Sequence, residues 1–102
     1  MVRHVIVWKL KDEYSGEKAA EIKAGIKEGL EGLSGKIPGL KEIRVYTEPL
    51  ASSNSDLMLD SLFEDEGSLK GYSVNPLHVD IADNKVRPFV AQRSCLDFEI
   101  PN

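Results

Sequence analysis

The first predicted strand, residues 2–11, is apolar on both of its faces. Val5 and Val7 lie on one face, before that face becomes basic at Lys9 and Lys11. Strand alternation places a second set on the opposite face, namely Val2, His4, Ile6, Trp8 and Leu10. A strand that is apolar on both sides must be covered on both sides. The chain therefore has to supply two layers of cover for one sheet.

The length of the chain restricts how that cover can be supplied. At 102 residues it fits a single domain over residues 1–102 and leaves no room for a second. A domain of this size buries only about 60–70% of the surface that its unfolded chain exposes. An apolar face left over after folding is therefore expected to bind a partner.

Composition excludes several classes of function. The net charge of −4 and the pI near 5.1 have the wrong sign for a protein that neutralises phosphates, so we expect no nucleic-acid partner. The apolar stretch before Lys9 is too short for a signal peptide or a membrane span, which predicts a cytoplasmic protein with no membrane contact. Cys95 is the only cysteine, so neither an intramolecular disulfide nor a Cys-rich zinc site can form.

The remaining elements follow from periodicity and turn residues. Ser15 is placed to cap a helix that runs to about residue 34, and its apolar stripe comprises Ile22, Ile26, Leu30 and Leu33. Gly35 suits the C-terminal cap of that helix. The pattern then predicts strands over 41–48 and 56–63, short helices over 64–73 and 77–86, and a last strand over 90–98.

The resulting order, β-α-β-β-α-β, is that of an α+β ferredoxin-like fold. Its crossovers put both main helices on one face of a four-stranded antiparallel sheet. The other face, which includes Val5 and Val7, then has no cover in a monomer. A second copy of the same face is the simplest cover, so we predict a homodimer built sheet against sheet.

Five short motifs, in this order and spacing, resemble the stress-responsive dimeric A/B-barrel (Dabb) family over nearly the full length. They are Arg3-His4-Val5-Ile6-Val7, Ile37-Pro38-Gly39-Leu40, Phe63-Glu64, Gly71-Tyr72 with Asn75-Pro76-Leu77-His78-Val79, and Leu96-Asp97-Phe98-Glu99. The resemblance implies a dimeric α+β barrel of two sheets.

The resemblance also implies candidate site residues. One characterised plant member of the family closes a polyketide chain by an aldol reaction, and its working tyrosine and two of its histidines correspond to Tyr72, His78 and His4. A further pocket histidine of that enzyme falls near Leu57 here, so this chain departs from that pattern. Some relatives hold a cation through backbone carbonyls in the turn that corresponds to residues 34–40.

The same three residues can be weighed by their chemistry. His78 lies near the start of a predicted helix, whose dipole favours a neutral ring that can accept a proton. Tyr72 could hold a substrate oxygen while His78 removes or relays a proton from a carbon acid, and His4 could assist by hydrogen bonding. The alternative is structural: His4 as a hydrogen-bonded core histidine, and Tyr72 as a core residue with its hydroxyl in water.

We expect no cofactor and no catalytic metal. Two histidines without a matching carboxylate cluster make a poor zinc site. Cys95 has no evident adjacent base and is expected to be a small buried packing residue. Two functions remain open: a homodimer that binds a small apolar molecule in the cavity between sheet and helices, and a cofactor-free enzyme of the cyclase or lyase kind.

Overall fold

The elements follow the predicted order in the computed structural model, which describes residues 1–101. The predicted bounds differ by a few residues, and the second half of the 77–86 helix is a π-helical turn at Ala82–Val86. A short 3-10 turn, Arg87–Phe89, leads into the last strand. The main elements are β1 (Val2–Leu10), α1 (Gly16–Glu31), β2 (Leu40–Tyr46), β3 (Leu57–Phe63), α2 (Glu66–Val74), α3 (Pro76–Ile81) and β4 (Val90–Glu99).

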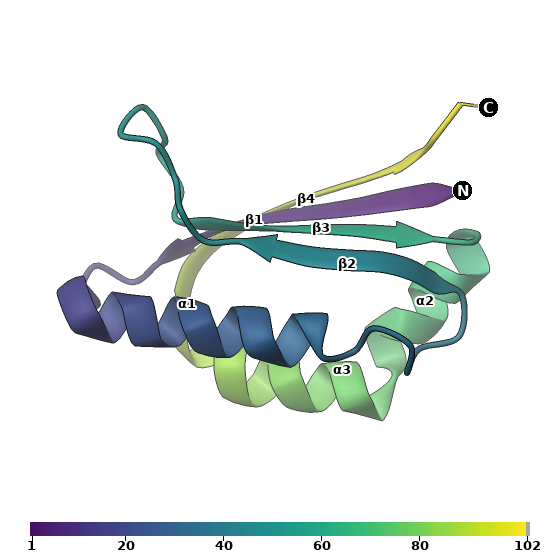
Figure 1. The fold of residues 1–102 in the computed structure, drawn as a ribbon, viewed down its shortest axis with the longest axis horizontal. Coiled ribbons are helices and arrows are strands. Elements are labelled where there is room, and N and C mark those ends of the chain that lie inside the picture. Colours follow the sequence, from purple (N-terminus) through teal and green to yellow (C-terminus); the bar gives the residue numbers. More distant parts are fainter. Residues whose placement is uncertain (102) are drawn as a thin grey trace.

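The four strands form one antiparallel sheet in the order β2-β3-β1-β4. All three α-helices lie on one face of this sheet, and its other face is uncovered (Figure 1). β1 occupies a central position, where Trp8 pairs with Leu57 of β3 and with Arg93 of β4. The predicted ferredoxin-like arrangement of strands and helices is confirmed.

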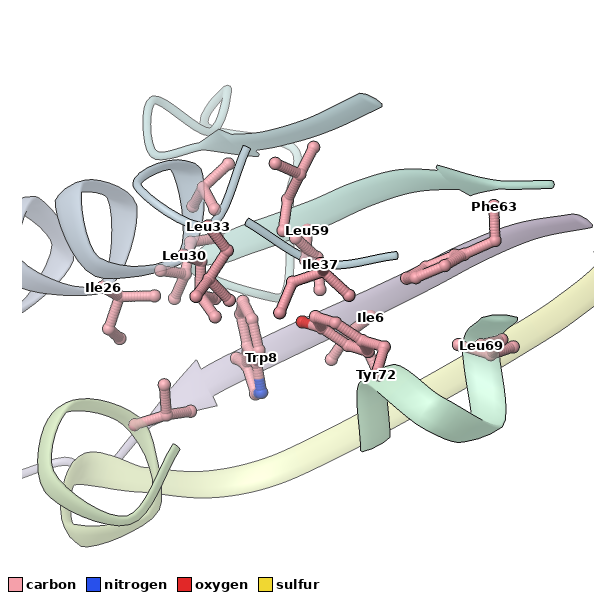
Figure 2. Packing of buried hydrophobic residues seen from close by; sticks show 14 of the residues in the cluster. Ile6, Trp8, Ile26, Leu30, Leu33, Ile37, Leu59, Phe63, Leu69 and Tyr72 are labelled. Atoms are coloured by element: carbon pink, nitrogen blue, oxygen red, sulfur yellow. The ribbon is translucent and has the colours of Figure 1, made fainter. Parts of the chain in front are cut away.

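The core lies between the sheet and the helices because β1 alternates as predicted. Its even-numbered residues, from Val2 to Leu10, are all buried toward the helices. Ile26 and Leu30 of α1 pack into the same layer as Trp8, together with Leu33, which follows the helix (Figure 2). Each such side chain contributes about 1.5–3 kcal/mol on burial, which compensates for the glycines that weaken α1. α1 thus depends on packing more than on its N-cap, since the Ser15 side chain makes no capping hydrogen bond.

Within residues 1–101, no helix is both long enough and apolar enough to cross a bilayer.

The uncovered side of the sheet, here called the open face, combines apolar and charged side chains. Strand pairing aligns them in three rows: Glu42-Leu62-Arg3-Phe98, Arg44-Asp60-Val5-Leu96 and Tyr46-Met58-Val7-Ser94. Leu96 is 63% exposed, Tyr46 is 51% exposed and Phe98 is 39% exposed. Arg3 donates to Asp60 at 2.7 Å within this face. Large apolar side chains left in water across a whole sheet face are typical of an interaction surface.

Gly39 is required where the chain enters β2. Its φ of +78° lies in the left-handed region, and a Cβ atom there would stand 2.1 Å from the Ser68 Oγ atom. Gly35 has nearly the same φ, +79°, but a Cβ atom added to it would meet nothing within 4 Å. A substitution at Gly35 would therefore strain the backbone without causing a steric clash.

We therefore expect Gly35→Ala to lower the free energy of unfolding by about 1–2 kcal/mol, the cost of a left-handed L-residue. Gly39→Ala should lower it further, because α2 must also move away from the new methyl group. Urea unfolding of the two variants measures the difference. Equal losses in both variants would show that the turn absorbs the methyl group without moving α2.

Candidate functional site

A cavity of about 280 Å³ lies between the inner face of the sheet and the segment from α2 to the π-helical turn. This pocket has apolar walls that include Ile6, Trp8 and Leu59. The three candidate residues predicted from the sequence, His4, Tyr72 and His78, all line this pocket. Two arginines that were not predicted, Arg87 and Arg93, line it as well. Leu57, where a relative has a pocket histidine, is a buried core residue and does not line this pocket.

Tyr72 and His78 form a stacked pair at the junction of α2 and α3. Their ring centroids are 4.1 Å apart and their planes are inclined by 33°. Asn75 ends α2 in an extended conformation and caps α3, since its side chain accepts from the Leu77 backbone N–H at 3.0 Å. Pro76 then starts α3. The helix break therefore brings two residues six positions apart into ring contact. In Figure 2 the Tyr72 ring reaches from α2 across the inner face of β1.

Both members of the pair carry a buried polar atom without a partner. Within residues 1–101, neither the Tyr72 Oη atom nor the His78 Nδ1 atom has a hydrogen-bond partner. A buried group of this kind costs about 1–3 kcal/mol. The alternative in which the Tyr72 hydroxyl lies in water does not hold, because this residue is only 1% exposed.

Burial favours the neutral form of both rings. It raises the pKa of Tyr72, against the opposing effect of Arg93. It also lowers the pKa of His78, and the positive charges of Arg87 and Arg93, with that of His4 when it is protonated, lower it further. The nearby Ser73 backbone, which does not meet hydrogen-bond geometry with the His78 Nδ1 atom, opposes this shift. His78 is thus held as neutral imidazole, as predicted, although the first cause is burial and not the helix dipole.

This shift predicts a dependence of stability on pH. Because the pKa of His78 in the folded state lies below its ordinary value of 6.5, the unfolded chain takes up a proton first as pH falls. The difference in proton uptake at His78 therefore lowers the free energy of unfolding as pH falls below about 6.5, and it adds no pH dependence above that value. We expect urea unfolding to show that the free energy of unfolding falls more between pH 8 and pH 5 in the wild type than in His78→Gln. Equal decreases would mean that His78 takes up a proton as readily in the folded protein as in the unfolded chain.

His4 is buried in the wall of the pocket and is oriented by β4. It is 7% exposed, and its ring centroid lies 6.0 Å from that of Tyr72. Its Nδ1 atom makes a hydrogen bond with the Asp97 carboxylate, which lies directly opposite on β4. A neutral His4 that donates from Nδ1 to Asp97 leaves Nε2 as an acceptor.

Cys95 is not the buried packing residue that was predicted. It is exposed, because it lies on an edge strand whose inner face the helices do not cover. Partial burial and the nearby Asp97 carboxylate raise the pKa of its thiol, with Arg93 acting in the opposite direction. The thiol is therefore protonated at neutral pH and is a poor nucleophile.

The family model described as the stress responsive A/B barrel domain matches residues 2–100. The chain belongs to the Dabb family. The resemblance drawn from the short motifs is thereby confirmed. No curated protein sequence matches this Dabb chain.

Solved structures support the same fold. A dimeric ferredoxin-like protein of unknown function from Bacteroides fragilis is 26% identical, with a TM-score of 0.90 over 97% of this chain and 95% of that chain. A Dabb family protein from Mesorhizobium loti is 19% identical, with a TM-score of 0.76 over 99% and 97%. A hydroxynitrile lyase from Passiflora edulis is 18% identical, with a TM-score of 0.73 over 98% and 93%. At 19% and 18% identity, the similarity to the Mesorhizobium loti and Passiflora edulis proteins shows a shared fold only.

Proposed function

We propose that this Dabb protein is a cytoplasmic homodimer that binds a small, mainly apolar molecule in the pocket, with an oxygen function directed at Tyr72 and His78. One observation carries the proposal. The Tyr72 Oη and His78 Nδ1 atoms are buried without partners in a pair of residues that lines a cavity of about 280 Å³. A ligand oxygen would satisfy both atoms, whereas the part of the chain that the structure describes does not.

The walls of the pocket support the class of ligand. Ile6, Trp8 and Leu59 supply apolar surface, which favours a small aromatic or polyketide-like molecule. Arg93 adds a positive charge to the lining, and within residues 1–101 no carboxylate lies within ion-pair distance of it. A ligand with a carbonyl, enolate or carboxylate group on an apolar body matches this arrangement.

Trp8 provides a direct test, because it is the only tryptophan and it lines the pocket. We expect compounds of this class to change the Trp8 fluorescence of the wild type with a saturable titration curve. The matched control is Tyr14→Phe, which loses a hydroxyl at a residue that belongs neither to the pocket lining nor to the strands of the open face and should bind in the same way. If a broad set of small aromatic and polyketide-like compounds leaves Trp8 emission unchanged, the binding proposal fails.

The homodimer is proposed to form through the open face. The Bacteroides fragilis protein is described as dimeric, and it is similar to this chain over nearly the full length of both. In this chain, the open face carries three exposed large apolar side chains, Tyr46, Leu96 and Phe98. Two identical copies of such a face can cover each other in an isologous contact.

A second candidate function is catalysis without a cofactor, of the cyclase or lyase kind. The stacked Tyr72–His78 pair favours it: neutral His78 would remove or relay a proton from a carbon acid, Tyr72 would hold the substrate oxygen, and His4 would assist by hydrogen bonding. On a true substrate, His78→Gln should lower kcat about 10²–10⁴-fold, the usual share of a general base. Full turnover by this variant would exclude the proton-transfer role and leave the binding proposal in place.

A further inference from the structure

The pairing of β1 with β4 brings His4, from the start of the chain, together with two possible metal ligands of the last strand, Cys95 and Asp97. His4 lies opposite Asp97, and Cys95 lies opposite Ile6, so all three side chains share the inner face of the sheet. The imidazole nitrogen, the thiol sulfur and the carboxylate oxygen lie within 4.8 Å of one another. The Cys95 Sγ atom is 3.9 Å from the His4 Nδ1 atom and 3.5 Å from the Asp97 Oδ1 atom.

These distances are close to those of a tetrahedral zinc site. Bonds of about 2.0–2.3 Å from a central ion place two ligand atoms about 3.3–3.6 Å apart. The two distances to sulfur need little change. His4 Nδ1 and Asp97 Oδ1, which are in hydrogen-bond contact, would separate to about 3.3 Å as the ion replaces the shared proton. The Asp97 side chain is 44% exposed and is therefore free to move that far.

We propose that His4, Cys95 and Asp97 form a binding site for a divalent transition-metal ion of the zinc class, with the fourth position open to solvent. Imidazole, thiolate and carboxylate are the three ligand types that zinc uses in proteins, and three protein ligands with one open position are typical of its reactive sites. The chemistry excludes magnesium and calcium, which prefer oxygen ligands. We expected no catalytic metal from the sequence because two histidines without a matching carboxylate cluster make a poor zinc site. The site proposed here uses only one histidine, His4, and takes its other two ligands from the last strand.

The surrounding charges are consistent with a bound cation. When the ion binds, the Cys95 thiol releases its proton to solvent, and the resulting thiolate and the Asp97 carboxylate supply two negative charges that balance the charge of the ion. Arg93, on the same face of β4 and two residues before Cys95, carries a positive charge that opposes the binding of any cation. Because His4 also lines the pocket, a metal on Nδ1 would leave the ring proton on Nε2 and turn that atom from an acceptor into a donor.

The experiment is a Co²⁺ titration of the reduced, chelator-treated full chain, followed by competition with Zn²⁺. Co²⁺ bound to a thiolate gives a charge-transfer band in the near ultraviolet, so the spectrum reports the Cys95 ligand directly. We expect one ion per chain, displaced by Zn²⁺. Cys95→Ser should remove the band, and both Cys95→Ser and Asp97→Asn should weaken binding at least about 100-fold, since even indirect partners of a metal ligand are worth 10–100-fold. Both residues are exposed, so these substitutions should leave the fold intact.

The matched control is Glu99→Gln, which removes another acidic residue two positions after Asp97 on the same face of β4. It should leave the Co²⁺ affinity unchanged. The proposal is overturned if the wild type shows no thiolate band with excess Co²⁺, or if Cys95→Ser binds the ion as tightly as the wild type. It is also overturned if Glu99→Gln weakens binding as much as Asp97→Asn, because the ion would then be held by general negative charge.

Discussion

Leu96→Glu is expected to convert the proposed homodimer into a monomer. Leu96 lies in the middle row of the open face, beside Val5, and is 63% exposed in the single chain. In an isologous contact each substitution enters the interface twice, and a desolvated carboxylate near its own copy costs several kcal/mol. We expect the dissociation constant of the dimer to rise at least about 100-fold, measured by sedimentation at micromolar concentration.

The matched control for this prediction is Val74→Glu. Val74 is 75% exposed, but it belongs to α2 in the helical layer, away from the open face. This variant should sediment as the wild type does. If Leu96→Glu remains a dimer, or if Val74→Glu dissociates it instead, the copies associate through a surface other than the open face. A wild type that is monomeric at micromolar concentration would exclude the homodimer itself.

Tyr72→Phe is expected to make the protein more stable and to make it bind its ligand less well. The substitution keeps the ring that packs against Phe63, 5.0 Å away, and against His78. It removes only a buried hydroxyl that has no partner within residues 1–101, and that hydroxyl costs about 1–3 kcal/mol. The free energy of unfolding should therefore rise by about 1 kcal/mol, while ligand affinity falls at least about 10-fold with the loss of one hydrogen bond.

Opposite changes in stability and binding distinguish a functional tyrosine from a core tyrosine. Tyr14→Phe is again the matched control, since it removes a hydroxyl from a half-buried ring outside the pocket and the open face and should change neither quantity. Urea unfolding and Trp8 fluorescence titration measure the two effects on the same samples. A loss of stability in Tyr72→Phe would mean that the hydroxyl already has a partner in the folded protein. An unchanged affinity would remove Tyr72 from the binding site.

The sequence predicted most of the fold because its patterns are local. Alternation along β1 identified the residues that face the helices, including His4 and Trp8, and the Asn75-Pro76 break located the start of α3. The end of the helix predicted over 77–86 was less accurate, since α3 gives way to a π-helical turn that no periodicity distinguishes. The Ser15 prediction was right in position and wrong in its hydrogen bond.

The part of the site that was missed depends on the register between strands. Asp97, Arg93 and Cys95 reach the site only because β4 pairs with β1, more than 80 residues earlier in the chain. Cys95 was predicted to be a buried packing residue because no base lies beside it in the sequence. β4 is an edge strand, and every one of its residues after Val90 is exposed. Single-chain periodicity does not reveal which strands lie at the edges.

The most direct test of the central claim is to record the ring signals of His78 and His4 by proton–nitrogen correlation NMR as small aromatic and polyketide-like compounds are added. The chain has two histidines, His4 and His78, so His78→Gln assigns both sets of ring signals. We predict that His78 titrates below its ordinary range, that at least one compound shifts its ring signals, and that this shift weakens in Tyr72→Phe. If His78 titrates normally and no compound moves either ring, the pocket is not a binding site and the stacked pair is part of the core.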